Sequence, residues 1–235
     1  AGAFVNDRIS LAAINGPEQV VLSGEVAAIE ALRVQLESQG IASIRLHTSH
    51  AFHSAMLDGI KESFRKEWEG IQFNSVNIPF VSNITGEFIT ASAVSADYWV
   101  RHMREAVRFS DGLQTILSQG KGLVFVEVGP GNSLISLLKQ QKAQTAPVAM
   151  NLVRSVKETA DDHGYFTGRI GELWAKGVAI DWNGYYKDQQ RRKISLPTYS
   201  FEPVKYPTEV DPIKNYLQAG LNLGLTENKE LKDWV

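Results

Sequence analysis

Two of the five histidines of the chain, His50 and His53, lie three residues apart in the stretch SHAFHSAM, between a strand-like run and a helix-like one. An imidazole titrates near neutral pH, so a histidine at such a junction can act as a general base. The pair could also bind a metal ion, but no third ligand stands at a spacing typical of metal sites. We therefore predict no metal. Two interpretations stay open, a catalytic base or a helix-capping histidine beside an exposed one.

A general base needs a nucleophile to activate, and the sequence contains no recognisable one. No serine lies in a Gly-x-Ser-x-Gly turn, because Ser23 precedes a single glycine and Ser133 follows two. The chain has no cysteine, which excludes a thiolate nucleophile, disulfides and cysteine-zinc sites. The motif EVGPG at residues 127–131 lacks the third glycine of a dinucleotide-binding fingerprint, so it indicates a structural turn. The residues alone predict a base without its nucleophile.

The elements that position these histidines belong to residues 8–68. Turn signals and apolar spacing predict five elements in this region. They are strands over 8–16 and 19–24, a helix over 25–39, a strand over 41–49 and a helix over 55–68. This order, β-β-α-β-α, indicates a compact α+β unit with antiparallel strands.

The region that follows has the pattern of an open α/β sheet. Residues 77–90 are strand-like around a turn at Thr85 and Gly86. Helices are expected over 97–103, 110–119, 133–140 and 158–176, and strands over 123–128 and 146–153. Both strand runs are mostly apolar, as expected of buried parallel strands. Strand, turn, helix and strand in this order predict a βαβ unit.

Composition excludes several classes of partner. The chain is 43% hydrophobic and 21% charged, an ordinary globular composition, with a net charge of -2 that argues against a nucleic-acid surface. The one tight basic cluster, RRK at residues 191–193, is interpreted as part of a solvated linker. No apolar run reaches the roughly 18 residues of a membrane span, and no signal peptide is visible. We expect no nucleic acid and no membrane as partners, and a cytoplasmic location.

Six motifs occur in an order that resembles the acyltransferase domain of modular polyketide synthases followed by its C-terminal linker. They are AAINGPEQVVLSG, SHAFHS, VSNITG, YWVRHMREAVRF, FVEVGPGNSL and LPTYSF. The resemblance implies an α/β fold, part of an α/β-hydrolase-like acyltransferase core with an inserted ferredoxin-like α+β subdomain, followed by an extended linker. The implied segments are the subdomain at 8–70, the C-terminal part of the core at 71–180, the linker at 181–208 and a tail of unknown role at 209–235.

The resemblance also implies a serine–histidine dyad. An acyl unit passes from coenzyme A to the serine, and then to the phosphopantetheine thiol of an acyl carrier protein. His53 matches the catalytic histidine and would take the serine proton during attack and return it to the leaving thiol. A main-chain carbonyl that maps onto His102 would orient it. No bound cofactor is implied, because the coenzyme A thioester is a substrate and the carrier phosphopantetheine an acceptor.

The tetrapeptide HAFH resembles that of malonyl-selective members. Phe52 is large enough to crowd the space that an α-methyl group would need, and one methyl group in a pocket discriminates by about 10- to 200-fold. We therefore expect a preference for malonyl and assign His50, Phe52 and Asn15 to substrate binding. Asn15, in the NGP turn, is expected to help polarise the site.

The family's Gly-His-Ser-x-Gly elbow and its carboxylate-binding arginine would lie upstream of the first residue of this chain. The expected partners are the missing N-terminal half of the acyltransferase, a neighbouring ketosynthase and an acyl carrier protein. Large side chains in the aromatic C-terminal segment would anchor the linker, namely Leu196, Pro197, Tyr199 and Phe201. Ser200 replaces the proline usual in the linker motif. The alternative is a catalytically inert acyltransferase remnant that serves as a docking scaffold.

Overall fold

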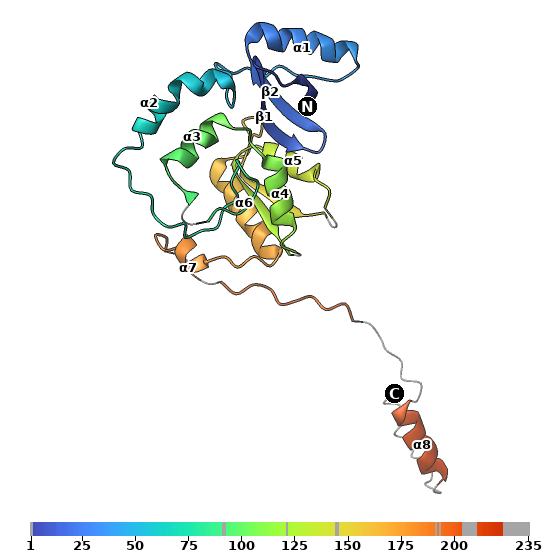
Figure 1. The fold of residues 1–235 in the computed structure, drawn as a ribbon. Coiled ribbons are helices and arrows are strands. Elements are labelled where there is room, and N and C mark those ends of the chain that lie inside the picture. Colours follow the sequence, from blue (N-terminus) through green and yellow to red (C-terminus); the bar gives the residue numbers. More distant parts are fainter. Residues whose placement is uncertain are drawn as a thin grey trace. The chain divides into compact units, whose positions relative to one another are not determined.

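Figure 1 shows the fold in a computed structural model, which describes residues 2–90, 93–120, 122–143, 146–190, 192, 194–203 and 211–222. The backbone divides into two compact units, Ala1–Ile180 and Asp181–Val235. The first unit holds both predicted α+β and α/β regions. In Figure 1 the dark blue hairpin with α1 lies at one end of this unit, α4 and α5 lie next to the hairpin, and α6 lies farther from it.

An antiparallel hairpin begins the first unit, after a short 3₁₀ helix η1 (Gly2–Phe4). Strands β1 (Ile9–Gly16) and β2 (Gln19–Gly24) pair from Ile9↔Gly24 to Gly16↔Gln19. A side chain at Gly24 would place its Cβ 2.1 Å from the main-chain oxygen of Arg8, so this pairing requires glycine. The two predicted strands are confirmed.

Helix α1 (Val26–Ser38) follows the hairpin, as predicted. Gly40, the predicted stop, has a φ of +72°, a left-handed conformation that glycine adopts without a Cβ penalty. The predicted helix over 55–68 is a 3₁₀ helix η2 (Ala55–Ile60) continued by the short helix α2 (Lys61–Lys66).

The predicted strand over 41–49 is wrong. Residues 41–48 form no ladder with any described residue, and 89% of the surface of Ile44 is exposed. Alternating apolar side chains favour extended backbone, but a strand also needs a neighbour to satisfy its N–H and C=O groups. The observed order of elements in this region is therefore β-β-α-η-α.

The α/β region forms around a short parallel sheet. Strands β3 (Val124–Pro130) and β4 (Val148–Val153) pair in parallel, joined through helix α5 (Ser133–Lys139), which confirms the predicted βαβ unit. Its other helices are α3 (Ala96–Arg104), α4 (Phe109–Leu117) and α6 (Asp162–Ala175), of which α6 packs against β4. The predicted turn at Gly86 closes an isolated bridge between Val81 and Phe88.

Glu127, in the motif EVGPG, joins strand β3 to helix α5. Its buried carboxylate accepts hydrogen bonds from the main-chain N–H groups of Leu134 (3.1 Å) and Ile135 (3.0 Å). These donors belong to the first turn of α5, where no intrahelical partner exists. The motif is a structural turn, as the sequence indicated, and Glu127 caps the helix that follows it.

The second unit contains helices α7 (Trp182–Tyr185) and α8 (Pro212–Asn222). Residues 194–203 between them form neither helix nor strand. The four predicted linker anchors Leu196, Pro197, Tyr199 and Phe201 are exposed, and the rings of Tyr199 and Phe201 lie 5.0 Å apart. Their role as anchors stays a prediction. The tail beyond α8, and Arg191 and Lys193 of the basic cluster, lie outside the described residues.

Candidate active site

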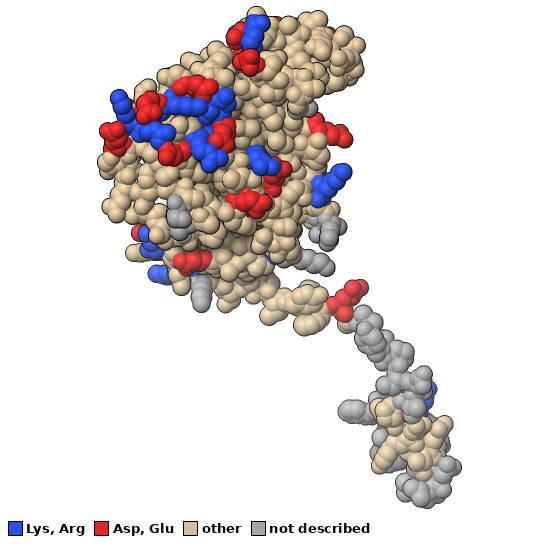
Figure 2. Space-filling model, in the orientation of Figure 1, with Lys and Arg blue, Asp and Glu red and all other residues tan. Residues whose placement is uncertain are grey.

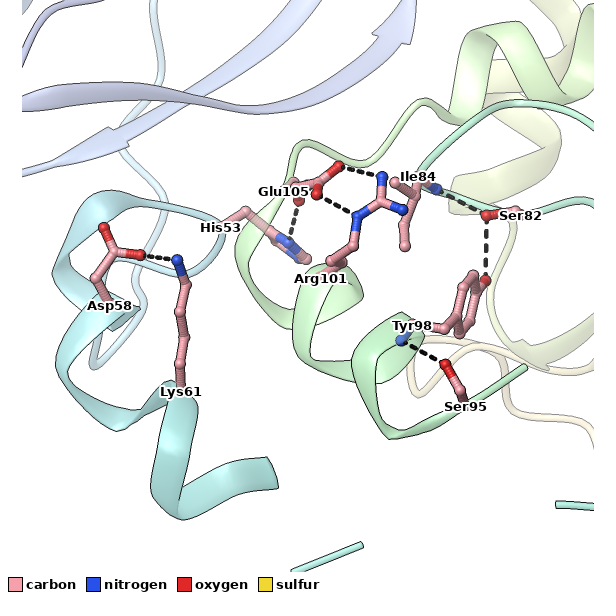
Figure 3. A network of polar contacts seen from close by, with 9 residues as sticks. All are labelled: His53, Asp58, Lys61, Ser82, Ile84, Ser95, Tyr98, Arg101 and Glu105. Atoms are coloured by element: carbon pink, nitrogen blue, oxygen red, sulfur yellow. Dashed lines mark hydrogen bonds and ion pairs between the residues drawn. The ribbon is translucent and has the colours of Figure 1, made fainter. Parts of the chain in front are cut away.

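His53 lies in the loop between the irregular segment 41–48 and η2, and its imidazole is half-buried. Its Nδ1 atom is 2.8 Å from the main-chain oxygen of Glu105, which follows α3 (Figure 3). A carbonyl oxygen only accepts hydrogen bonds, so Nδ1 carries the proton of the neutral ring. The second ring nitrogen, Nε2, then holds a lone pair. This tautomer is the one that a general base uses.

The carbonyl partner of His53 corrects the prediction, which placed it on His102. Helix α3 ends at Arg104, and a carbonyl in its last turn points along the helix axis. Glu105 is the C-cap, with φ -83° and ψ 161°, so the chain is extended there and its carbonyl leaves the helix direction. The motif located the right segment, but not the residue at which the helix ends.

The segment that carries this carbonyl is held on two sides. The Glu105 carboxylate accepts bonds from the guanidinium of Arg101, at 2.7 and 3.2 Å (Figure 3). Two residues further on, Val107 bridges to strand β1 by donating to Ala12 (2.9 Å) and accepting from Ile14 (2.8 Å). The hairpin thereby fixes the carbonyl that orients His53.

His102 lies beside the site through its side chain. Its ring centre is 6.4 Å from that of His53, and its Nε2 atom is 3.4 Å from the amide nitrogen of Asn83. An amide nitrogen only donates, so this contact favours a neutral His102 with an unprotonated Nε2. Burial, with the nearby His53 adding to it, lowers the pKa of His102 from its ordinary 6.5.

This pKa shift makes the stability of the fold depend on pH. A depressed histidine pKa means that the unfolded chain binds a proton more readily than the folded one. The contribution of neutral His102 is complete above the unfolded pKa near 6.5 and is lost as pH falls below it. We expect acidification from about pH 7 to about pH 5 to lower the melting temperature more in the wild type than in His102→Gln.

The exposed histidine His163, in the first turn of α6, provides the matched control. We expect His163→Gln to keep the pH dependence of the wild type. Parallel melting curves for the wild type and His102→Gln across this range would contradict the assignment.

The other predicted substrate residues lie apart from the His53 contact. His50 is exposed, with Nδ1 2.9 Å from the hydroxyl of Ser49 and its ring 6.2 Å from that of Phe52, which is itself 51% exposed. Asn15, near the end of β1, uses its main-chain oxygen to accept a bond from Gln141. Their roles in substrate binding stay predictions.

Acidic and basic side chains interleave on the face that carries α2 and α3 (Figure 2). Asp58 pairs there with Lys61 and with Arg104, and hydrogen bonds from these two, first Lys61, lower the pKa of its carboxyl group. A hollow of about 300 Å³ opens on the same side. It is lined by Arg65, Trp68, Glu69, Ser95, Ala96 and Asp97, and not by His53.

Two residues near the base, Glu105 and Ser54, were not identified from the sequence. Glu105 acts through its main chain, which leaves no signal in residue type. Ser54, next to His53, is the N-cap of η2, and a serine directly before a helix is a signal that could have singled it out.

Within the described ranges, no group of three or more histidine, aspartate or glutamate side chains is arranged to hold a metal ion. Of the helices that the structure describes, none combines the length and apolar character needed to cross a bilayer.

Comparison with known proteins identifies relatives of this chain. The family described as acyl transferase domain matches residues 2–178. Polyketide synthase GfsA of Streptomyces halstedii is 36% identical over 199 residues, which cover 84% of this chain. The acyltransferase domain from the second module of the salinomycin polyketide synthase is 37% identical, with a TM-score of 0.74 over 83% of this chain. The malonyl-CoA:ACP transacylase of Synechocystis sp. PCC 6803 is 28% identical, with a TM-score of 0.54 over 62% of it.

The chain spans only part of each relative. It covers 3% of the length of the Streptomyces synthase, 46% of the salinomycin acyltransferase chain and 48% of the Synechocystis transacylase.

Proposed function

Because the chain belongs to the acyl transferase domain family and matches the acyltransferases of modular polyketide synthases, we propose that it supplies the catalytic base of a malonyl transfer from coenzyme A to an acyl carrier protein. The observation that supports this most directly is the bond from His53 Nδ1 to the Glu105 carbonyl. It leaves Nε2 free to accept a proton. A scaffold without chemistry would not need this geometry.

The proposed reaction has two half-steps. In the first, His53 Nε2 takes the proton of a serine hydroxyl while the serine oxygen attacks the thioester carbonyl. The carbon–sulfur bond breaks, and the coenzyme A thiolate leaves with the proton from His53. In the second, the carrier phosphopantetheine thiol gives its proton to His53 and attacks the acyl-serine. The serine leaves and recovers that proton.

We place the nucleophilic serine in a part of the acyltransferase outside this chain. The sequence has no Gly-x-Ser-x-Gly turn, and the chain spans 46% of the salinomycin acyltransferase. Two described surfaces support further pairing. Residues 41–48 pair with no strand among the described residues, and β3 and β4 form a sheet of two strands in which Val128 is 79% exposed. The open edges of the β3–β4 sheet can accept additional strands.

The same reasoning supports the finer division of the chain. We assign 8–70 to a ferredoxin-like subdomain, 71–180 to the end of a hydrolase-like core, and 181–208 to a linker whose exposed side chains contact a neighbouring ketosynthase. Exposed Leu196, Tyr199 and Phe201 have the size typical of interface anchors.

The preference for malonyl is assigned to Phe52. Its ring is half-exposed, one residue before the base, where it can limit the space for an α-substituent. We expect Phe52→Ala to raise the use of methylmalonyl-CoA relative to malonyl-CoA by about 10-fold, since one methyl group is discriminated by about 1–3 kcal/mol. Competition between the two substrates, read by mass spectrometry of the carrier protein, gives this ratio. An unchanged ratio would show that residues other than Phe52 determine the selectivity.

The function itself is tested with the complete acyltransferase, a carrier protein and a set of acyl-CoA thioesters. We expect malonyl to appear on the phosphopantetheine of the carrier, and coenzyme A to be released. Failure to acylate either the enzyme or the carrier with any thioester would reject the proposal.

A further inference from the structure

His53 has an unusual backbone conformation. Its φ is +55°, and it is the one described non-glycine residue with a positive value. The left-handed region costs a residue with a Cβ about 1–2 kcal/mol. Such a conformation persists where the surrounding contacts hold it in place, and it is found most often at functional sites.

The contacts that surround this conformation converge on Ser54. Its side chain is one of two described side chains below 2% exposure, with 1% of its surface accessible. The hydroxyl donates to the main-chain oxygen of Ala51 (2.6 Å) and accepts from the N–H of Met56 (3.2 Å). One hydroxyl therefore ties the chain before His53 to the chain after it.

The same loop is attached to the hairpin. The N–H of Ala55 donates to the hydroxyl of Ser10 in β1, at 3.3 Å. Within the loop itself, the N–H of Leu57 donates to the main-chain oxygen of Ser54, at 3.1 Å. Strand β1 also bridges to Val107, two residues beyond the Glu105 carbonyl. The loop that carries the imidazole and the segment that accepts its Nδ1–H hydrogen bond are thus both attached to strand β1.

We propose that Ser54 is a positioning residue for the base: its buried hydroxyl closes the loop in which His53 is left-handed, and so keeps the imidazole on the Glu105 carbonyl with Nε2 free. This inference rests on the proposed function for its effect on rate. Its structural half, the tautomer of His53, does not depend on acyl transfer.

Removal of the hydroxyl changes what the loop can do. Without the bonds to Ala51 and Met56, the backbone of His53 relaxes toward a negative φ, and the ring leaves the carbonyl. A neutral imidazole in water samples both tautomers, and the form protonated on Nε2 cannot act as the base.

The test is Ser54→Ala in the complete acyltransferase, labelled with ¹⁵N-histidine, with the His53 signals assigned by comparison with His53→Gln. In the wild type, we expect Nδ1 to carry the proton and Nε2 to be unprotonated. In Ser54→Ala, we expect a mixture of both tautomers. The kcat of acyl transfer should fall by about 10- to 100-fold with little change in KM, because a misplaced catalytic group slows the chemistry and not the binding.

Ser95 provides the matched control. It is also a serine N-cap, and its hydroxyl accepts from the N–H of Tyr98 at 3.2 Å, at the start of α3. Ser95→Ala removes a cap of the same kind without touching the His53 loop. We expect it to lower the melting temperature comparably, while the tautomer of His53 and kcat stay as in the wild type.

A His53 that keeps its Nδ1 proton in Ser54→Ala, or an equal kcat loss in Ser95→Ala, would overturn the inference. If Ser54→Ala does not fold, Ser54→Cys gives the same readout, since a thiol is a weaker donor and acceptor of similar shape. A tautomer that responds as expected in an enzyme that transfers no acyl group would reject the proposed function and keep the positioning role.

Discussion

Replacing His53 with alanine is expected to slow acyl transfer by at least about 10³-fold while the protein remains folded. The rate falls because, among the described residues, only His53 donates a side-chain hydrogen bond to the Glu105 carbonyl and keeps its second ring nitrogen free to accept a proton. Without a base, the serine hydroxyl stays protonated and attacks the thioester poorly. The fold tolerates the change because the imidazole is half-buried and water can replace its hydrogen bond to the Glu105 carbonyl.

The measurement is single-turnover acylation of the enzyme by malonyl-CoA, followed by intact-mass analysis. His163→Ala is the matched control, because His163 is exposed on α6. We expect it to keep wild-type rates. Added imidazole should restore part of the activity of His53→Ala, since the variant lacks a base and keeps the site around it.

Acyl transfer at more than a tenth of the wild-type rate in His53→Ala would remove this histidine from the mechanism. A variant that loses activity and also unfolds at a much lower temperature would instead indicate that His53 supports the fold. The two outcomes separate the two interpretations that the sequence left open, a base and a cap.

Local patterns were enough to predict the elements whose stabilising contacts lie close in sequence. The hairpin β1–β2, the helix that ends at Gly40 and the βαβ unit around Glu127 were all predicted from spacing and turn residues. Their hydrogen-bond partners lie within the same stretch of chain or in the next element. The pattern therefore contains the information that decides the structure.

Long-range pairing was not predictable in the same way. Residues 41–48 alternate like a strand, but no neighbouring strand among the described residues accepts them. Alternation reports which side chains could share a face, and a ladder depends on backbone from another segment. The sequence of this segment indicates a preference for extended backbone, but it does not indicate which strand, if any, pairs with it.

The site was predictable in its chemistry and not in its geometry. His53 was identified from residue type, position and family resemblance. Its left-handed φ, the hydroxyl of Ser54 and the carbonyl of Glu105 depend on where the chain turns to within one residue. A sequence pattern does not define helix ends that closely, which explains why the carbonyl was assigned to His102.

The largest expected loss of stability comes from Gln141, which follows the C-cap residue of α5. Its buried side chain donates to the main-chain oxygens of Asn15 (3.1 Å) and Leu137 (3.0 Å), and accepts from the hydroxyl of Ser110 (2.9 Å) and the amide of Gln114 (3.4 Å). One amide thus connects strand β1, helix α4 and helix α5. It is a side-chain link between the hairpin and the α/β region, beside the main-chain bridge of β1 to Val107.

We expect Gln141→Met to lower the free energy of unfolding by about 3 kcal/mol. Methionine matches the shape of glutamine but neither donates to Asn15 nor accepts from Ser110, and each buried polar group left without a partner costs about 1–3 kcal/mol. For the complete acyltransferase, which is about twice as long as this chain, that loss corresponds to a melting temperature lower by about 3–6 °C. Thermal and urea unfolding of the complete acyltransferase measure both quantities.

Gln140→Met is the control, since Gln140 is the exposed neighbour of Gln141 and its replacement should change stability by less than about 0.5 kcal/mol. Equal melting temperatures for the two variants would show that the network contributes nothing to stability.

The catalytic consequence of Gln141→Met follows from its position. Strand β1 supports both the Ser54 loop and the segment of Glu105, so loosening its contact with α4 and α5 should also broaden the tautomer population of His53. A folded Gln141→Met enzyme with an unchanged His53 tautomer would limit the role of the network to stability.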